Sequence, residues 1–107
     1  MTCFSCPYLG APIELNEERE RHIAERHPDL LPDHRDRLTT TLLDPDSIRR
    51  SRRFAAARLF SRWYSDVKEG KHVVVVVVSE GDRGRHWIIT AYIARELAPG
   101  EIEWARS

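Results

Sequence analysis

Before residue 46, apolar residues recur at a spacing typical of helices. Asn16 has the side chain of an N-cap, acidic residues fill the next turn, and Pro28 prevents much continuation, so a helix is predicted over about 17–27. Pro32 suits the first turn of a second helix, which would end at the Asp-Pro pair 44–45. The apolar face of this second helix would comprise Leu38, Leu42 and Leu43.

After residue 46 the pattern becomes typical of strands. Residues 58–64 alternate, and one face carries Arg58, Phe60, Arg62 and Tyr64. Residues 73–78 are six consecutive valines, which is typical of a strand covered on both faces. We therefore expect the valine strand in the middle of a sheet.

Residues 86–94 predict a further strand. Alternation places Trp87, Ile89, Ala91 and Ile93 on one face and Ile88, Thr90 and Tyr92 on the other. Turns of about six residues separate the strands, which favours an antiparallel meander.

These elements predict one α+β domain, in which two N-terminal helices pack on an antiparallel sheet of about four strands. Residues 1–12 are expected to be irregular because the stretch CPYLGAP is rich in Pro and Gly. Residues 13–46 would form the helical part, opening with a short strand at 13–15. Residues 47–104 would form the meander, with GEIEW as a short edge.

The chain shows no signal for a membrane. Its longest apolar run, Val73 to Val78, is far short of the roughly 20 residues of a membrane-spanning helix. The N-terminus lacks a charged leader followed by an apolar core. The protein is therefore expected to be soluble and cytoplasmic.

Positive charge is concentrated in one segment, although the formal net charge of the chain is zero. Residues 47–65 carry six arginines and no acid, whereas residues 14–46 carry ten acids against five arginines. Guanidinium groups fit the oxygens of phosphates well, and four arginines are candidates for binding a nucleic acid: Arg49, Arg50, Arg52 and Arg53. The alternative is that the segment pairs with the acidic half of the same molecule.

Two histidines in the first predicted helix are candidates for proton transfer, because the ordinary pKa of imidazole is close to neutral pH. His22 and His27 lie five residues apart, about 140° around an ideal helix, so they point in neighbouring directions. The alternative is that both lie on the helix surface and have no reactive role.

The same histidines also fit a metal site. Cys3 and Cys6, followed by His22 and His27, match the loose C-x2-C…H-x3–5-H spacing of tetrahedral zinc sites. A structural zinc ion there would pin the N-terminal segment onto the first helix. The alternative is two free thiols, the usual state in a reducing cytosol.

The order of these segments resembles the phage-associated branch of the barnase–EndoU–colicin–RelE-like (BECR) nuclease superfamily, from about Ile13 to Trp104. The resemblance rests on IELNEERERHIAERHP, LLDPDSIRRS, RLFSRWY, the valine strand and WIITAYIA. It implies a similar α+β fold and a ribonuclease that needs no metal ion for catalysis, often a toxin. It further implies an active cleft lined by His22 or His27, by Arg58, and by Thr90 or Tyr92.

Such a site would cleave RNA through its own 2′-hydroxyl. A neutral histidine removes the hydroxyl proton, the oxygen attacks the adjacent phosphorus, and Tyr92 or the second histidine protonates the leaving 5′-oxygen. Arg58 and Arg62 would stabilise the charge that grows on the phosphate. The resemblance therefore implies an endoribonuclease that acts on RNA, with an antitoxin or another protein as a candidate further partner.

Two other functions fit the same residues. One is a nucleic-acid-binding module without catalysis, which would hold RNA on its arginines and aromatic rings. The other is a small zinc-stabilised interaction domain whose arginines contact an acidic protein.

Overall fold

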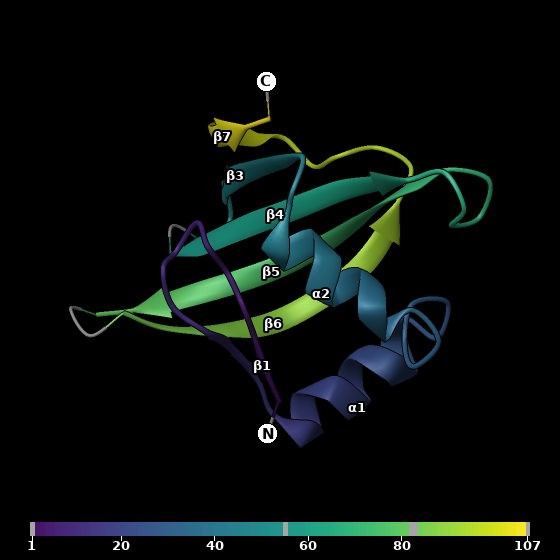
Figure 1. The fold of residues 1–107 in the computed structure, drawn as a ribbon, viewed down its shortest axis with the longest axis horizontal. Helices are drawn as coiled ribbons and strands as arrows, with labels where there is room; N and C mark the ends of the chain where they lie inside the picture. The colour runs from purple at the N-terminus through teal and green to yellow at the C-terminus, as the bar shows by residue number, and fades with distance from the viewer. Residues whose placement is uncertain (1, 55, 82–83, 107) are drawn as a thin grey trace.

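Seven strands and two helices make up the part of the chain that the computed structural model describes, residues 2–54, 56–81 and 84–106. The strands are β1 (Thr2–Phe4), β2 (Ile13–Leu15), β3 (Ser47–Ser51), β4 (Ala57–Tyr64), β5 (Lys71–Glu80), β6 (Arg85–Ala94) and β7 (Gly100–Ala105). The helices α1 (Glu17–Arg26) and α2 (Arg35–Leu43) both lie between β2 and β3 in the chain (Figure 1).

All these strands join one sheet in the order β1-β2-β6-β5-β4-β3-β7. β2 and β6 run parallel, and the other neighbouring strands run antiparallel. The prediction of two helices on an antiparallel sheet of about four strands is therefore wrong, because the sheet has seven strands and is mixed. The segment 1–12, expected to be irregular, contains β1. The short strand predicted at 13–15 is confirmed as β2, and the predicted edge GEIEW is confirmed as part of β7. β1 is three residues long, which is too short for an alternating pattern to identify a strand.

The centre of the sheet is the meander β3-β4-β5-β6, which the sequence did predict. β5 occupies the middle of the sheet, with three strands on either side. Val73 to Val77 are buried, because β5 is covered on both of its faces. The central position predicted for the valine strand is therefore confirmed.

A β-bulge in β6 reverses the alternation of its side chains halfway along the strand. Residues 76 and 77 of β5 pair with Thr90 and Ile88, so Ile89 is an extra residue. Ile88 consequently joins the main core, whereas Tyr92 packs with a smaller cluster on the opposite side of the sheet. The prediction that Ile88, Thr90 and Tyr92 share one face is therefore wrong.

The first helix agrees with its prediction. The side chain of Asn16 accepts a hydrogen bond from the backbone N–H of Arg19 at 2.7 Å, and α1 ends at Arg26, before Pro28. The second helix begins later than predicted, at Arg35. Pro32 lies instead in the turns before this helix. Leu30 lies in the same turns, and its side chain is buried in the core.

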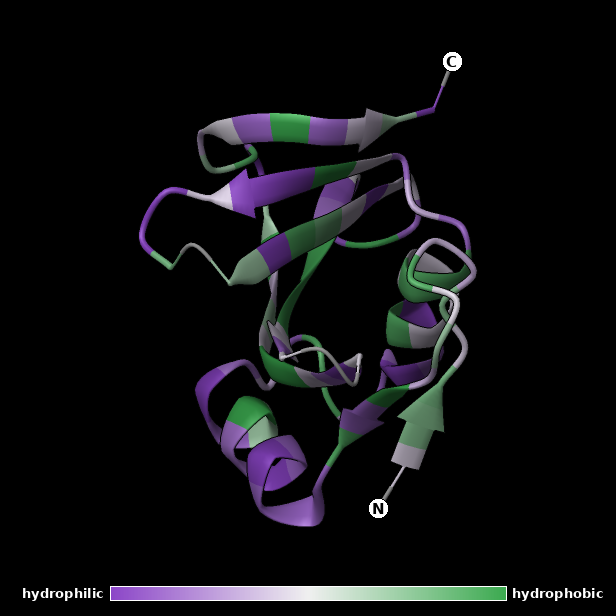
Figure 2. Cartoon of the chain, turned by 90° about the vertical axis from the view of Figure 1, so that its left-hand side faces the viewer, coloured by the Kyte–Doolittle hydropathy of each residue, from purple (hydrophilic) through white to green (hydrophobic). Residues whose placement is uncertain are grey.

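One side of the sheet, called here the helix-facing side, carries the main core. α2 packs on β4 and β5 on this side, and α1 lies along β6 (Figure 1). Figure 2 shows that α1 consists mostly of hydrophilic residues, and Ile23 is its buried side chain. Neither helix of the described residues is long and apolar enough to cross a membrane.

Two phenylalanines close together in the sequence test this assignment of the core. Phe60 is fully buried on β4, whereas Phe54 is 62% exposed. We expect Phe60→Ala to lower the free energy of unfolding by about 3–5 kcal/mol, because it leaves a cavity in the core. Phe54→Ala, the matched control, should change it by less than about 0.5 kcal/mol. Chemical denaturation of both variants measures the two values, and equal losses would contradict the assignment.

Candidate functional site

Six polar side chains form one connected network on the helix-facing side of the sheet. They are called here the Arg58 cluster and comprise Tyr8, Arg50, Arg58, Ser79, His86 and Glu103. The network lies where β4 begins, β5 ends and β6 begins, at the left of Figure 1 and away from α2. The N-terminal segment and β7 supply its remaining members.

The carboxylate of Glu103 is the centre of the network. It accepts hydrogen bonds from the Nε atoms of Arg50 and Arg58 and from the hydroxyl of Tyr8, each at 2.7 Å. Burial alone would raise the pKa of Glu103, but the hydrogen bonds from Arg58 and Tyr8 outweigh it and lower that pKa. Glu103 is therefore ionised at neutral pH and holds two cations beside it.

A β-bulge in β7 brings Glu103 into this position. Ile48 of β3 pairs with Trp104, but the next residue, Arg49, pairs with Ile102, so Glu103 is the extra residue. In a regular ladder Glu103 would lie opposite Arg49 and point to the other side of the sheet.

His86 lies at the other end of the network. Its Nδ1 is 2.6 Å from the hydroxyl oxygen of Ser79, and that hydroxyl also accepts a hydrogen bond from Nη1 of Arg58 at 3.2 Å. Burial, assisted by the positive charge of Arg58, lowers the pKa of His86. The imidazole is therefore neutral at pH 7, and its Nε2 has no partner among the described residues.

Tyr8 joins the N-terminal segment to the network. Burial raises the pKa of Tyr8, and its hydrogen bond to Glu103 raises it further, so the phenol keeps its proton at neutral pH. Its ring packs edge-on against Phe60, with 6.3 Å between the ring centroids, and is tilted against Trp104.

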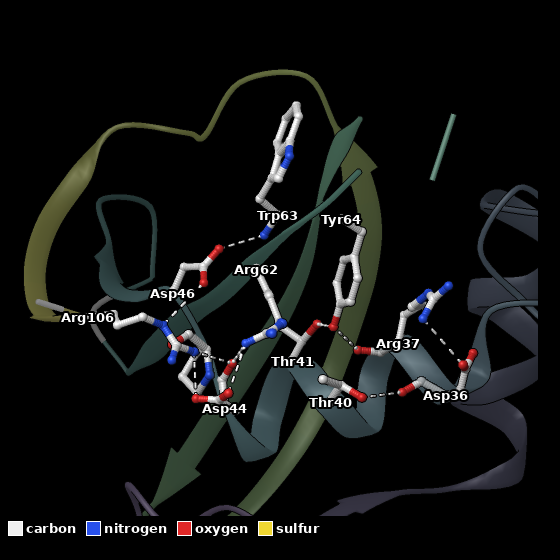
Figure 3. Close-up of polar contacts among 11 residues, drawn as sticks. Asp36, Arg37, Thr40, Thr41, Asp44, Asp46, Arg62, Trp63, Tyr64 and Arg106 are labelled. Atoms are coloured by element: carbon white, nitrogen blue, oxygen red, sulfur yellow. Dashed lines mark hydrogen bonds and ion pairs between the residues drawn. The ribbon is translucent and has the colours of Figure 1, made fainter. Parts of the chain in front are cut away.

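The six arginines of residues 47–65 separate into three groups. Arg50 and Arg58 bind Glu103. Arg62 binds Asp44, which Arg106 also contacts, as Figure 3 shows, and Arg49 reaches the carbonyl oxygen of Ala98 at 3.4 Å. The side chains of Arg52 and Arg53 are exposed and have no partner in the described ranges. Internal pairing therefore accounts for only part of the positive segment.

The other predicted site residues lie apart from the Arg58 cluster. His22 is exposed on the outer surface of α1. The ring of His27 lies 6.1 Å from that of Tyr92, whose pKa is raised by burial. Thr90 and Tyr92 are on the side of the sheet opposite Arg58, because of the bulge in β6. The predicted site residues therefore do not lie together in one cleft. His27 contacts Tyr92, whereas Arg58 lies near a different histidine.

The predicted zinc ligands are not grouped either. Across the described residues, the structure contains no group of three or more His, Cys, Asp or Glu side chains that could hold a metal ion. Cys3 is exposed and Cys6 is buried, and both are free thiols. Burial raises the pKa of Cys6, which disfavours the thiolate that a metal ion requires. Zinc binding therefore stays a prediction without support from the geometry.

Sequence reasoning missed four members of the Arg58 cluster: Tyr8, Ser79, His86 and Glu103. One signal was present, because Ser79 and His86 end and begin two strands joined by a short turn, and such residues pair across a hairpin. No comparable signal marks Tyr8 or Glu103. One belongs to a segment without periodicity, and the other is the extra residue of a bulge.

Comparison of the chain with protein-family models, with curated proteins and with solved structures found no match. The resemblance to the BECR nucleases therefore stays a prediction that rests on the sequence alone.

The surroundings of His86 predict its titration. We expect an NMR titration of His86 to give a pKa below about 6.5, the ordinary value for imidazole. Because the neutral imidazole is favoured in the folded state, the resulting stabilisation is complete above about pH 6.5 and is lost as the pH falls through the lower pKa of the folded protein. Arg58→Met should raise the pKa of His86, whereas Arg62→Met, the control on the same strand, should not. A pKa that is unchanged in Arg58→Met would contradict this account.

Proposed function

We propose that the protein is an endoribonuclease that cleaves RNA by attack of the 2′-hydroxyl and needs no metal ion for the chemical step. One observation carries the proposal: Arg58 connects a neutral histidine, through Ser79, with a protonated tyrosine, through Glu103. A base, an acid and a cation are the three groups that this reaction needs.

His86 is the proposed general base. The proposed role uses the tautomer with the proton on Nδ1, facing the hydroxyl oxygen of Ser79, which leaves the lone pair of Nε2 free to accept a proton. A lowered pKa keeps this lone pair available at neutral pH. Ser79 therefore acts as a positioning residue that fixes the ring through Nδ1.

Tyr8 is the proposed general acid, and the arginines stabilise the transition state. The phenol retains its proton until it is needed and is 40% exposed, so it can reach the leaving group. Arg58 and Arg50 concentrate positive charge beside it, where the phosphate would lie. Glu103 orients all three donors in the absence of substrate.

In the proposed step the 2′-oxygen bonds to phosphorus as the bond from phosphorus to the 5′-oxygen breaks. His86 Nε2 takes the proton of the 2′-hydroxyl, and the Tyr8 hydroxyl gives its proton to the departing oxygen. The products are a 2′,3′-cyclic phosphate and a free 5′-hydroxyl. The reducing cytoplasm, where two free thiols are stable, is the proposed location.

Arg52 and Arg53 would hold the RNA outside the reacting phosphate. Both are exposed and unpaired among the residues described, and they lie in the hairpin that joins Arg50 to Arg58. The hydroxyl oxygen of Ser51 accepts hydrogen bonds from the backbone N–H groups of Arg53 and Phe54, which fixes the start of this hairpin.

Cleavage of RNA in the presence of EDTA tests the reaction. We expect the wild-type protein to produce cyclic phosphate ends, and His86→Ala and Tyr8→Phe to lower kcat/KM at least about 100-fold, because each removes a proton-transfer group. His34→Ala, a histidine before α2, should leave kcat/KM unchanged.

Intact RNA between pH 5 and 8 with the wild-type protein would reject the reaction. If RNA is nevertheless bound, the non-catalytic binding module is the better reading. Full activity in His86→Ala, with activity lost in His22→Ala or His27→Ala, would assign the base to α1 instead.

The dependence of RNA binding on salt tests the role of the hairpin arginines. We expect the double variant Arg52→Ser/Arg53→Ser to bind single-stranded RNA more weakly, with a salt slope that is smaller by about 1.4, because each phosphate contact on a single strand contributes about 0.7 to the slope. Arg19→Ser/Arg21→Ser on α1 changes the net charge equally and should leave the slope unchanged. Binding curves at several salt concentrations provide the measurement, and equal slopes for the two double variants would contradict a local role.

A further inference from the structure

An apolar cavity of about 300 Å³ lies beside the Arg58 cluster. Its walls come from the N-terminal segment, the C-terminal end of α2 and the strands β3 and β7, and they include Pro7, Tyr8, Leu43, Pro45 and Trp104. Tyr8 belongs to both places, because its ring lines the cavity while its hydroxyl binds Glu103. Trp104 follows Glu103 directly in β7.

This cavity gathers side chains that a protein normally covers. Tyr8 is 40% exposed, Leu43 is 50% exposed and Trp104 is 36% exposed, and these are three of the large hydrophobic side chains most open to solvent. Apolar and aromatic side chains gathered around a hollow are the usual lining of a small-molecule binding site.

The cavity suits a flat, uncharged ligand. Its one charged lining residue, Asp44, already binds Arg62 with one carboxylate oxygen and Arg106 with the other. The rings of Tyr8 and Trp104 are tilted by 55°, with 6.4 Å between their centroids, so they do not stack on each other. An aromatic face therefore remains available for a further ring.

We propose that this cavity binds a nucleobase of the RNA, next to the phosphate held by the Arg58 cluster. The inference rests on the proposed function for the identity of the ligand. Charge favours RNA over an apolar peptide, because Arg50 and Arg58 outnumber the single carboxylate of Glu103 that they share, and Arg52 and Arg53 in the same hairpin are exposed. A phosphate chain that also carries flat apolar groups is a single-stranded nucleic acid.

The test measures binding without cleavage. A fluorescently labelled RNA oligonucleotide with 2′-O-methyl groups cannot be cleaved by the proposed reaction, because it lacks the attacking hydroxyl. We expect Trp104→Leu to weaken its binding about tenfold, the loss of one stacked base, and Trp104→Phe, which keeps a ring, to weaken it less than about threefold. Trp63→Leu, which changes an exposed tryptophan outside the cavity, should have no effect.

A second oligonucleotide separates base binding from phosphate binding. An abasic chain of the same length keeps every phosphate, so its affinity should be the same for the wild type and for Trp104→Leu. The proposal is overturned if Trp104→Leu and Trp104→Phe bind the 2′-O-methyl RNA equally, if the abasic chain loses as much affinity, or if neither chain binds. If binding depends on Trp104 but natural RNA stays intact, the base site stands and the nuclease reaction fails. If natural RNA is cleaved but binding does not depend on Trp104, the base site is rejected and the nuclease reaction stands.

Discussion

The candidate site depends on the hydrogen bonds and ion pairs that the carboxylate of Glu103 accepts. This carboxylate joins three segments that are distant in sequence: the N-terminal segment through Tyr8, the start of β4 through Arg58, and β3 through Arg50. Two partly buried cations lie together there only because this anion lies between them. The donor groups of Tyr8, Arg50 and Arg58 therefore converge on one point, which this carboxylate occupies.

The central part of the fold could be predicted because its signals are local. The Asn16 cap, the valines of β5 and the alternation of β4 each depend on a few neighbouring residues, and the structure agrees with them. The outer strands were predicted in part: the short strand at 13–15 is β2 and the short edge GEIEW is β7, but β1 was not predicted. β1 is a strand because its long-range pairing with β2 supplies its hydrogen bonds, and its three residues carry no period of their own.

The candidate site contains the types of residue that the sequence analysis named, but mostly at other positions. An imidazole, a phenol and guanidinium groups were expected together, and the Arg58 cluster contains each of them. Arg58 belongs to both sets, but His86 and Tyr8 stand where His22 or His27 and Tyr92 were expected. The bulge in β6 explains part of the difference, because it turns Tyr92 to the opposite side of the sheet. A prediction from alternating apolar and polar positions assumes regular pairing, so it cannot reveal an inserted residue of this kind.

Because of the two bulges, the number of residues in β6 and β7 decides which side chains face the candidate site. Removing one residue from β7 near Ile102, or from β6 near Ile89, would restore a regular ladder. Every side chain on one flank of the deletion would then point to the opposite face of the sheet. Relatives of this protein that keep the same chemistry should therefore vary in the identity of these residues and conserve the spacing between them. Gapless alignment across β6 and β7 is a more informative criterion for such relatives than overall identity.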